Sequence, residues 1–440
     1  MTKHLECAGT AKCVAQDGSS RHRVVVSGIG LWTSLGEGVE TNWRRLLKGD
    51  SGIAPIRYWN CEQYATKVAA CVRSPGSPVN DDPDAIRQGF LLFESVVGEA
   101  IRDSALDDGA VDLSKVGLAA GTSVNHLDWR QFRRMIDYLE ADRPALDAQA
   151  YWRHGQADAG MFPQTQGELV NRHTARKYKL GGPSFVADTA CAASAHAIGE
   201  AFRMVRRGET PAMIAGGAAA LVRPTHILAF ERLKALSTSA DPARSSRPFD
   251  RDRDGFVMGE AAGAVVLESI ESAQGRGARI YGELAGYGSS LSAHTLTDPS
   301  PDGGAEARAM ALALEDAGTE PEEIAHVAAH GTSTPKGDLT ETLAIRRVFG
   351  RHAGRLLVSS NKGQLGHTIS AAGVCNLVTA LKSIQTSWVA PTATLRSPDP
   401  QCDLDYVARE PRRSEIGAAV SNSFAFGGQN AALVVRRLAD

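Results

Sequence analysis

The sequence predicts an α/β fold in which buried strands alternate with helices. Apolar runs recur between glycine-rich turns, and several are apolar throughout, as expected of strands that are covered on both faces. Helical stretches of about 10 to 20 residues separate many of these runs, as parallel crossover connections require. A repeated helix pattern also indicates two halves of similar construction.

The predicted strands follow one another along the whole chain. Their buried faces are rich in Val, Ile, Leu and Ala, and glycine or polar residues bound each run. They comprise residues 22–31, 116–122, 183–190, 212–222, 263–270, 279–290, 326–332, 356–362, 417–424 and 430–437.

Two predicted helices share one spacing of apolar residues, 3, 4 and 3. One follows Cys191 and the other follows His367, and each comes after a strand-like segment. Such spacing gives a helix with one apolar face. We therefore expect a flexible extension over 1–22, an N-terminal half over 23–285 and a C-terminal half over 286–440. The apolar residues concerned are Ala195, Ile198, Phe202 and Val205 in the first helix, and Val374, Leu377, Leu381 and Ile384 in the second.

Composition indicates a cytoplasmic protein. The 440 residues include 48 basic and 50 acidic side chains without a block of like charge, which argues against nucleic-acid or membrane-surface binding. No apolar run is long enough to span a bilayer, and the polar N-terminus lacks the apolar core of a signal peptide. The 7 cysteines are irregularly spaced, which suits reduced thiols better than a disulfide framework.

Cys191 lies where the segment PSFVADTA passes into a predicted helix ending in MVRRGE. A helix N-terminus favours a thiolate, so we expect a pKa below the ordinary value of about 8.5. Alanines on both sides leave room for a substrate. The alternative is that Cys191 is a small buried hydrophobe, as most free cysteines are.

Two histidines follow strands in the C-terminal half. His330 ends an apolar strand in VAAHGTSTPKGD, and His367 lies in VSSNKGQLGHTISAAG five residues after Lys362. Side chains at the carboxyl ends of buried strands commonly face a site in α/β proteins. A lone histidine at such a junction is usually structural, but two of them matched to Cys191 indicate a Cys/His/His site.

A glycine pair lies just before the last strand, in SFAFGGQN. Gly427 and Gly428 permit a close approach of the backbone to a ligand, and a backbone N–H there could contribute to an oxyanion hole.

Together these segments resemble the elongating β-ketoacyl-[acyl-carrier-protein] synthases, or ketosynthases, of the thiolase superfamily. The resemblance runs in order from about Val24 to Arg437 and includes RPFDRDRDGFVMGEAAGAVVLE, HGTSTPKGD, GHTISAAG and SFAFGGQN. It implies a duplicated five-layer α/β/α/β/α thiolase fold, which would explain the repeated helix spacing.

The resemblance also implies roles for single residues. Cys191 matches the nucleophile that accepts an acyl chain as a thioester, and His330 and His367 match the pair that assists decarboxylation of malonyl-ACP. Lys362 matches a lysine that organises the histidines and water. The remaining matches are the backbone N–H groups of Cys191 and Phe426 as the oxyanion hole, Thr332 and Thr334 along the route of the malonyl pantetheine, Phe426 as a gate, and Val124 and Phe230 in the acyl pocket. Lys234 and the neighbouring Arg232 are candidates for docking an acidic carrier protein, and a solvated charged face is an equally good interpretation of them.

No metal or bound cofactor is implied, because the substrates are carried on the 4′-phosphopantetheine of acyl carrier protein (ACP). The implied reaction is a decarboxylative Claisen condensation of an acyl thioester with malonyl-ACP. The implied assembly is a homodimer, or a heterodimer with a subunit like a chain-length factor.

Departures from the family indicate a specialised enzyme. Asn376 stands where a glutamate, nine residues after the second histidine, usually pairs with the lysine, so we expect Lys362 to lack that partner. Ala425 replaces a glycine of the gating loop, and the aromatic segment 126–166 is longer than in housekeeping enzymes. We therefore expect a type II polyketide or unusual fatty-acid ketosynthase.

Two alternatives remain open, and a third is disfavoured. A housekeeping elongation enzyme is a close alternative, and a weakly active or non-catalytic partner subunit is another, although such subunits normally lack the cysteine. A degradative thiolase would need a second reactive cysteine in a glycine-rich C-terminal motif, and neither Cys375 nor Cys402 lies in one.

Overall fold

A computed structural model describes residues 22–57, 59–72, 85–123 and 168–438, with a few isolated positions between 136 and 153. The expected extension over 1–22 lies outside these residues apart from its last residue. Val124 and nearly all of the segment 126–166 lie outside them as well.

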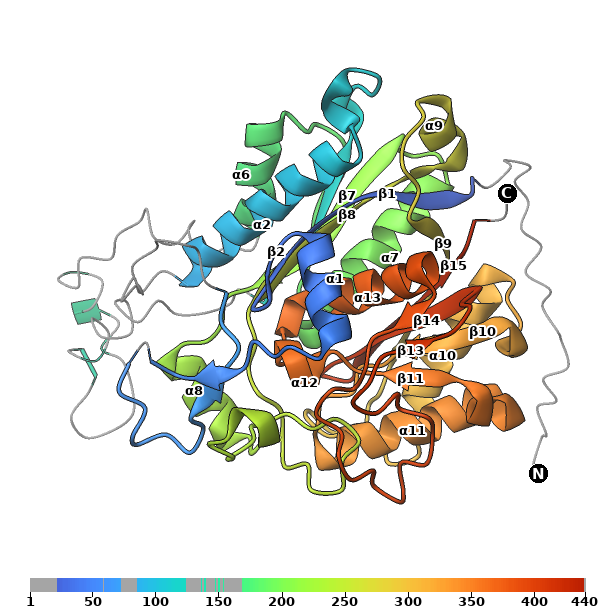
Figure 1. Cartoon of the computed structure of the whole chain (residues 1–440). Coiled ribbons are helices and arrows are strands. Elements are labelled where there is room, and N and C mark those ends of the chain that lie inside the picture. The colour runs from blue at the N-terminus through green and yellow to red at the C-terminus, as the bar shows by residue number, and fades with distance from the viewer. Residues whose placement is uncertain are drawn as a thin grey trace, which may run out of the picture.

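One sheet of 11 strands runs through the molecule (Figure 1). It has two arms, which join where β1 pairs with β9 between residues 24–26 and 282–284. The first arm consists of β6 (Ser184–Ala187), β5 (Gly117–Gly121), β7 (Ala212–Ala219), β8 (Ala261–Ser269) and β1 (Val24–Thr33), with the short β2 (Gly36–Glu37) beside β1. The second arm consists of β11 (Leu357–Ser359), β10 (Ile324–Ala328), β14 (Ala418–Phe424), β15 (Gln429–Arg436) and β9 (Gly282–Leu291).

The two arms repeat the same pattern of strand directions. In each, three parallel strands at the outer edge are followed by two antiparallel strands. Every strand predicted from the sequence is present, and the repeat confirms the duplicated construction.

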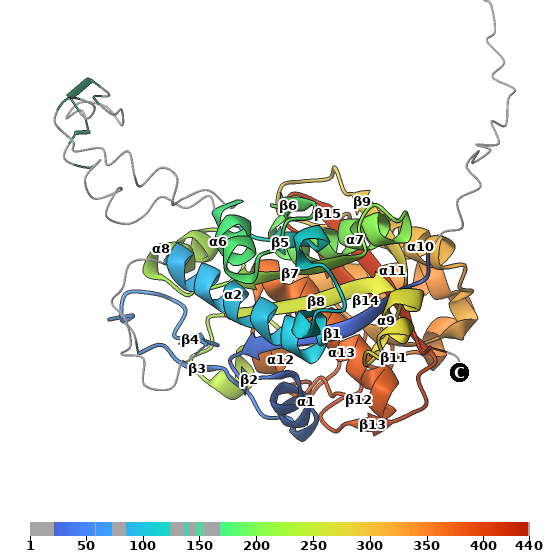
Figure 2. The same cartoon turned by 90° about the horizontal axis from the view of Figure 1, so that it is seen from above.

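Helices form three layers around the two arms (Figures 1 and 2). The helices α7 (Ala193–Arg206) and α13 (Ala372–Thr386) lie between the arms and contact strands of both. The outer layer of the first arm is α2 (Ala85–Asp103) and α6 (Glu168–Tyr178), and that of the second is α10 (Gly304–Ala317) and α11 (Pro335–Phe349). This is the five-layer thiolase fold that the resemblance implies.

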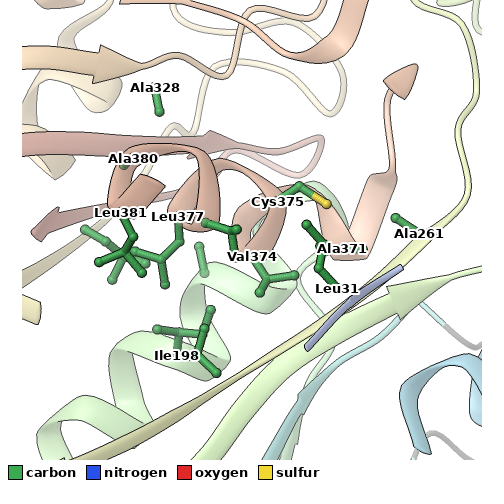
Figure 3. Packing of buried hydrophobic residues seen from close by; sticks show 14 of the residues in the cluster. Leu31, Ile198, Ala261, Ala328, Ala371, Val374, Cys375, Leu377, Ala380 and Leu381 are labelled. Carbon is green, nitrogen blue, oxygen red and sulfur yellow. The ribbon is translucent and has the colours of Figure 1, made fainter. Parts of the chain in front are cut away.

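The two inner helices bury the apolar residues predicted for them. All eight residues of the repeated spacing are buried, and Figure 3 shows Val374, Leu377 and Leu381 of α13 packed over Ile198 of α7. Gly373 permits this contact, because a Cβ atom there would lie 2.6 Å from Ala195 N. The helix after Cys191 ends as predicted, with Gly208 in the left-handed conformation at φ 71°.

Shorter elements complete the described part of the chain. They are α1 (Val39–Lys48), β3 (Ala54–Pro55), β4 (Val68–Ala69), α8 (Pro224–Arg232), α9 (Ile270–Gly275), α12 (Lys362–Leu365), β12 (Trp388–Val389) and β13 (Arg412–Arg413). The boundary predicted near residue 285 falls inside β9, and the division of the chain there stays a prediction. Among the described helices, none is long and apolar enough to cross a membrane.

Candidate active site

Cys191 lies in a tight turn between the end of β6 and the start of α7. This 3₁₀ turn spans Ala190–Ala192, and Ala190 adopts a left-handed conformation at φ 47°, which is unfavourable for a non-glycine residue. Strained backbone of this kind is concentrated at functional sites. Cys191 is 6% exposed. Because α7 begins at Ala193, the predicted place of Cys191 beside a helix N-terminus is confirmed.

His367 contacts Cys191 directly from the other half of the chain. Its Nε2 atom lies 3.1 Å from Cys191 Sγ. The backbone around His367 is fixed on both sides, because its N–H donates to Val257 O at 2.6 Å and its carbonyl accepts from Gly259 N at 2.9 Å. The Phe256 ring packs edge-on against the imidazole, with 5.0 Å between ring centroids.

His330 lies next to His367. The centroids of the two imidazole rings are 5.3 Å apart and the rings are nearly perpendicular. The backbone N–H groups of His330 and Gly331 donate to the two oxygens of Glu341 at 2.8 and 2.7 Å. One carboxylate on α11 therefore holds the turn that follows β10, and with it the position of His330.

Burial keeps both histidines neutral. Burial lowers the pKa of His330 and of His367 well below the ordinary value, and the positive charge of Lys362 lowers both further. Both Nδ1 atoms are buried without a hydrogen bond to any described residue. The site thus presents two neutral imidazoles, which can exchange protons or donate N–H bonds to a developing anion.

Lys362 is a buried cation at the start of α12. Its side chain is 1% exposed, and Nζ makes no hydrogen bond to the described residues. Burial lowers its pKa to about 8, and the carboxylate of Glu341 opposes that shift. Glu341 acts on Lys362 through its charge alone, because no ion pair or hydrogen bond joins them, so the expectation that Lys362 lacks a paired carboxylate stays a prediction.

The thiol of Cys191 has a higher pKa than the sequence predicts. Burial raises it to about 11, and the charge of Lys362 and the backbone N–H groups of Phe426 and Cys191 offset only part of this. The expected lowering at a helix N-terminus is wrong for the free site, because burial removes the water that would solvate a thiolate. Cys191 therefore needs a base to take its proton, and His367 is in contact with it.

The turn after β14 brings a backbone donor to the thiol. The backbone N–H of Phe426 is one of the groups that lower the pKa of the Cys191 thiol. Gly427 and Gly428 have left-handed φ angles of 83° and 77°, and a Cβ atom on Gly428 would overlap the carbonyl oxygen of Ser292. The glycine pair thus fixes the turn that presents the Phe426 N–H.

Three aromatic rings pack together around Phe230. Phe230 on α8 lies 6.4 Å from Phe426 and 5.6 Å from Phe256 between ring centroids. Val124, the other residue predicted for the acyl pocket, lies outside the described residues. Arg232 and Lys234 lie at the end of α8 and beyond it, and both are exposed.

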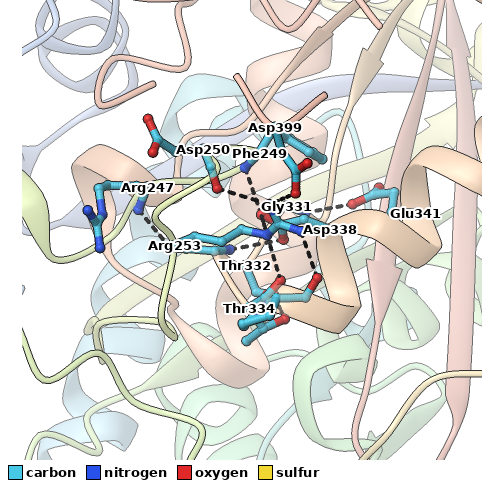
Figure 4. Close-up of polar contacts among 12 residues, drawn as sticks. Arg247, Phe249, Asp250, Arg253, Gly331, Thr332, Thr334, Asp338, Glu341 and Asp399 are labelled. Carbon is cyan, nitrogen blue, oxygen red and sulfur yellow. Dashed lines mark hydrogen bonds and ion pairs between the residues drawn. The ribbon is translucent and has the colours of Figure 1, made fainter. Parts of the chain in front are cut away.

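A buried ion-pair network supports the loop that carries Thr332 and Thr334 (Figure 4). The two threonine hydroxyls are 2.9 Å apart. Arg253 donates to the carbonyls of Thr334 and Pro335 at 3.1 and 2.7 Å and to Asp399 at 2.6 Å. This arginine thereby ties the loop after His330 to the charged segment RPFDRDRDGF.

The structure thus joins residues that are distant in sequence into one site. It brings together Cys191, His330, Lys362, His367 and Phe426. Sequence reasoning missed Glu341 and Phe256; the one available signal for Glu341 was its place on the helix that follows the His330 loop. No group of three or more potential metal ligands occurs in the part of the chain that the structure describes.

Comparisons with known proteins agree with this geometry. The model described as "Beta-ketoacyl synthase, N-terminal domain" matches residues 21–273, and "Beta-ketoacyl synthase, C-terminal domain" matches residues 281–396. The chain is 37% identical over 421 residues to 3-oxoacyl-[acyl-carrier-protein] synthase 2 of Synechocystis, covering 95% of this chain and 98% of that protein.

Two solved structures show a similar fold. One is the AntDE:AntF complex, a type II PKS acyl-carrier protein in complex with its ketosynthase bound to the hexaketide. It matches with a TM-score of 0.83 and 29% identity, over 95% of this chain and 100% of that chain. The other is the ishigamide ketosynthase/chain length factor, with a TM-score of 0.82 and 30% identity over the same shares of the two chains.

Proposed function

The chain belongs to the β-ketoacyl synthase family, and from that premise we propose that it condenses an acyl thioester with malonyl-ACP to give β-ketoacyl-ACP. The observation that carries this proposal is the 3.1 Å contact between Cys191 Sγ and His367 Nε2, together with the 5.3 Å between the ring centroids of His367 and His330. A nucleophile, a base and a second neutral imidazole within one buried site suit acyl transfer followed by carbanion chemistry.

In the first step, Cys191 attacks the carbonyl carbon of the acyl group carried on phosphopantetheine. His367 takes the thiol proton as the new C–S bond forms. The bond to the pantetheine sulfur then breaks, and the proton passes to that leaving thiol. The backbone N–H groups of Cys191 and Phe426 stabilise the anionic oxygen, and each such donor is worth on the order of 10²–10³ in rate.

In the second step, malonyl-ACP loses CO₂ and its thioester becomes an enolate. Neutral His330 and His367 donate N–H bonds to the enolate oxygen, which requires the low pKa values that burial gives them. The enolate carbon attacks the acyl group on Cys191, a C–C bond forms and the thiolate leaves. Lys362 stabilises that thiolate, since its charge already lowers the pKa of Cys191.

We propose that the residues at the rim of the site determine which substrates are accepted. Phe230 and Phe426 bound the acyl side, and we propose that Val124 and the segment 126–166 complete it. Thr332 and Thr334 lie beside His330, where they suit the malonyl pantetheine. Exposed Arg232 and Lys234 fit an acidic carrier protein.

We propose a role in a type II polyketide or specialised fatty-acid pathway, in the cytoplasm, as a homodimer or with a chain-length-factor-like partner. The two structural neighbours, a type II PKS ketosynthase and a ketosynthase/chain length factor, support that pathway and that assembly. The 37% identity to 3-oxoacyl-ACP synthases 2 equally supports housekeeping fatty-acid elongation as the second candidate.

Intact-protein mass spectrometry with a panel of acyl-ACPs tests both the activity and the pathway. We expect a covalent acyl adduct on the wild-type protein and none on Cys191→Ala. Adducts only with saturated chains of ordinary length would favour housekeeping elongation over the specialised pathway. An adduct that persists on Cys191→Ala would contradict the assignment of the nucleophile.

A further inference from the structure

Asn376 on α13 stands where the family resemblance leads us to expect a glutamate. Its side chain is 1% exposed, and its Nδ2 donates to two backbone oxygens, Ala329 O and Asn422 O, both at 2.9 Å. The parallel register of β10 and β14 ends one residue earlier, at Ala328 and Ser421. The amide therefore links these strands just beyond their last paired residues.

Each of the two residues whose carbonyl accepts from Asn376 is linked directly to His330 or to the carboxylate that holds it. Ala329 directly precedes His330, and Asn422 donates through its own Nδ2 to Glu341 Oε1 at 3.0 Å. Glu341 in turn accepts from the backbone N–H of His330. Asn376, Asn422 and Glu341 thus enclose the backbone of His330 in a closed chain of buried hydrogen bonds.

The two contacts require a side chain that donates twice. Carbonyl oxygens have no hydrogen to give, and an ionised carboxylate has none either. A carboxylate at position 376 would therefore leave both carbonyls without this donor and would add negative charge to a network that already contains Glu341. A neutral amide satisfies both oxygens and leaves Glu341 to balance the charge of Lys362.

We propose that Asn376 is a positioning residue for His330. It fixes the end of β10 against β14, and through Asn422 it orients the carboxylate of Glu341, which holds the backbone N–H of His330. This inference rests on the proposed function, in which decarboxylation depends on His330 and formation of the acyl-enzyme depends on Cys191 and His367. Asn376 is accordingly needed more for decarboxylation than for acylation.

The test compares Asn376→Asp with a matched control, Asn42→Asp. Asn42 is also buried and also donates through Nδ2 to two backbone oxygens, Gly36 O at 2.9 Å and Gly38 O at 2.8 Å, at the start of α1. Two rates are measured for each full-length variant: acyl-enzyme formation from acyl-ACP alone, and CO₂ release from malonyl-ACP alone.

For Asn376→Asp we expect CO₂ release to fall about 10²-fold at pH 8, the size of loss that a small misplacement of a reacting group can cause, while acylation falls much less. Lowering the pH should restore part of the CO₂ release, because a protonated aspartic acid regains one hydrogen to donate. Asn42→Asp should leave the ratio of the two rates unchanged.

An unchanged ratio in Asn376→Asp, or a pH profile parallel to that of the wild type, would overturn the inference. If that variant cannot be obtained folded, Asn376→Ser, which keeps one donor, is measured by the same ratio. Failure of the wild-type protein itself in both assays would instead contradict the proposed function, so the two failures are distinguishable.

Discussion

The helices α7 and α13 occupy equivalent places in the two arms, yet the turns before them carry different chemistry. Alanines surround Cys191 in the turn before α7, whereas His367 precedes α13 with Lys362 close by and His330 on the neighbouring strand end. The apolar faces of the helices follow one spacing and pack on each other. Duplication thus provides two inward-facing helix starts, one that carries the thiol and one that carries the imidazole in contact with it.

Removal of the thiol should produce the largest effect. Cys191→Ala deletes the one reacting group of the first half, so we expect complete loss of the acyl adduct while malonyl-ACP decarboxylation remains. Mass spectrometry and CO₂ release measure the two properties in the same preparation. Loss of decarboxylation in a folded variant would contradict the proposal that malonyl-ACP is decarboxylated without Cys191.

Substitution of Gly428 should be the next largest effect, because this glycine fixes the Phe426 N–H beside Cys191. Its left-handed φ and the nearby Ser292 carbonyl leave no space for a Cβ atom. We expect Gly428→Ala to lower the acylation rate about 10²-fold through loss of an oxyanion-hole donor.

Gly427→Ala is the matched control for that variant. Gly427 also has a left-handed φ, but a Cβ atom there would meet nothing within 4 Å. We expect only the conformational cost, about 1–2 kcal/mol of stability, in thermal unfolding. Equal losses of acylation in the two variants would show that backbone strain, rather than the position of the Phe426 turn, is decisive.

Substitution of Phe230 should have an intermediate effect, on the preference among acyl chains. Removing this ring in Phe230→Ala deletes its contacts with Phe256 and Phe426, each worth about 1 kcal/mol beyond burial. We expect the preference among acyl-ACPs to shift toward bulkier chains by about tenfold in kcat/KM, with malonyl decarboxylation unchanged. An unaltered preference would place Phe230 outside the acyl pocket.

The pH dependence of decarboxylation should be weak near neutrality. Histidines with ordinary pKa values near 6.5 would gain charge as the pH falls through that value. Burial holds the pKa of His330 and His367 well below it, so both stay neutral and CO₂ release should be flat from about pH 7.5 to pH 6. In Lys362→Met, the loss of CO₂ release on acidification should occur at a higher pH than in the wild type. The substitution removes a positive charge that lowers the pKa of both histidines. A pH profile with a midpoint near 6.5 in the wild type would contradict neutral histidines.

Carrier-protein docking should show the smallest effect. Exposed charges at a rim contribute mainly to association, so Arg232→Ala with Lys234→Ala should raise KM for acyl-ACP a few-fold at low salt and leave kcat unchanged. Arg308→Ala, on the outer helix α10 and equally exposed, is the control. An equal increase in KM for this control would argue against a specific docking surface at α8.

Sequence patterns predicted the strands and the two inner helices because both depend on local regularities. Buried strands are apolar throughout, and the 3, 4, 3 spacing marks the inner faces of α7 and α13. The residue types of the site were predictable from the segments that carry Cys191, His330 and His367, which lie at strand ends.

The features that the sequence missed depend on contacts between distant segments. The position of Glu341 beside His330 requires α11 to pack against the end of β10, and the only sign of this in the sequence is that the helix with Glu341 follows the His330 loop. The raised pKa of Cys191 has the same origin, because burial results from the whole fold rather than from the helix start. Likewise, the sequence indicated only that Asn376 replaces a carboxylate, whereas in the structure its amide joins the ends of β10 and β14.

On the proposed mechanism, the second half decarboxylates malonyl-ACP without the nucleophile of the first half. The decisive measurement is CO₂ release from malonyl-ACP by Cys191→Gln, with and without His330→Ala in the same chain. We predict that Cys191→Gln releases CO₂ without forming an acyl-enzyme or a condensation product, and that adding His330→Ala abolishes the release. Loss of CO₂ release in folded Cys191→Gln, or its persistence in the double variant, would contradict the account.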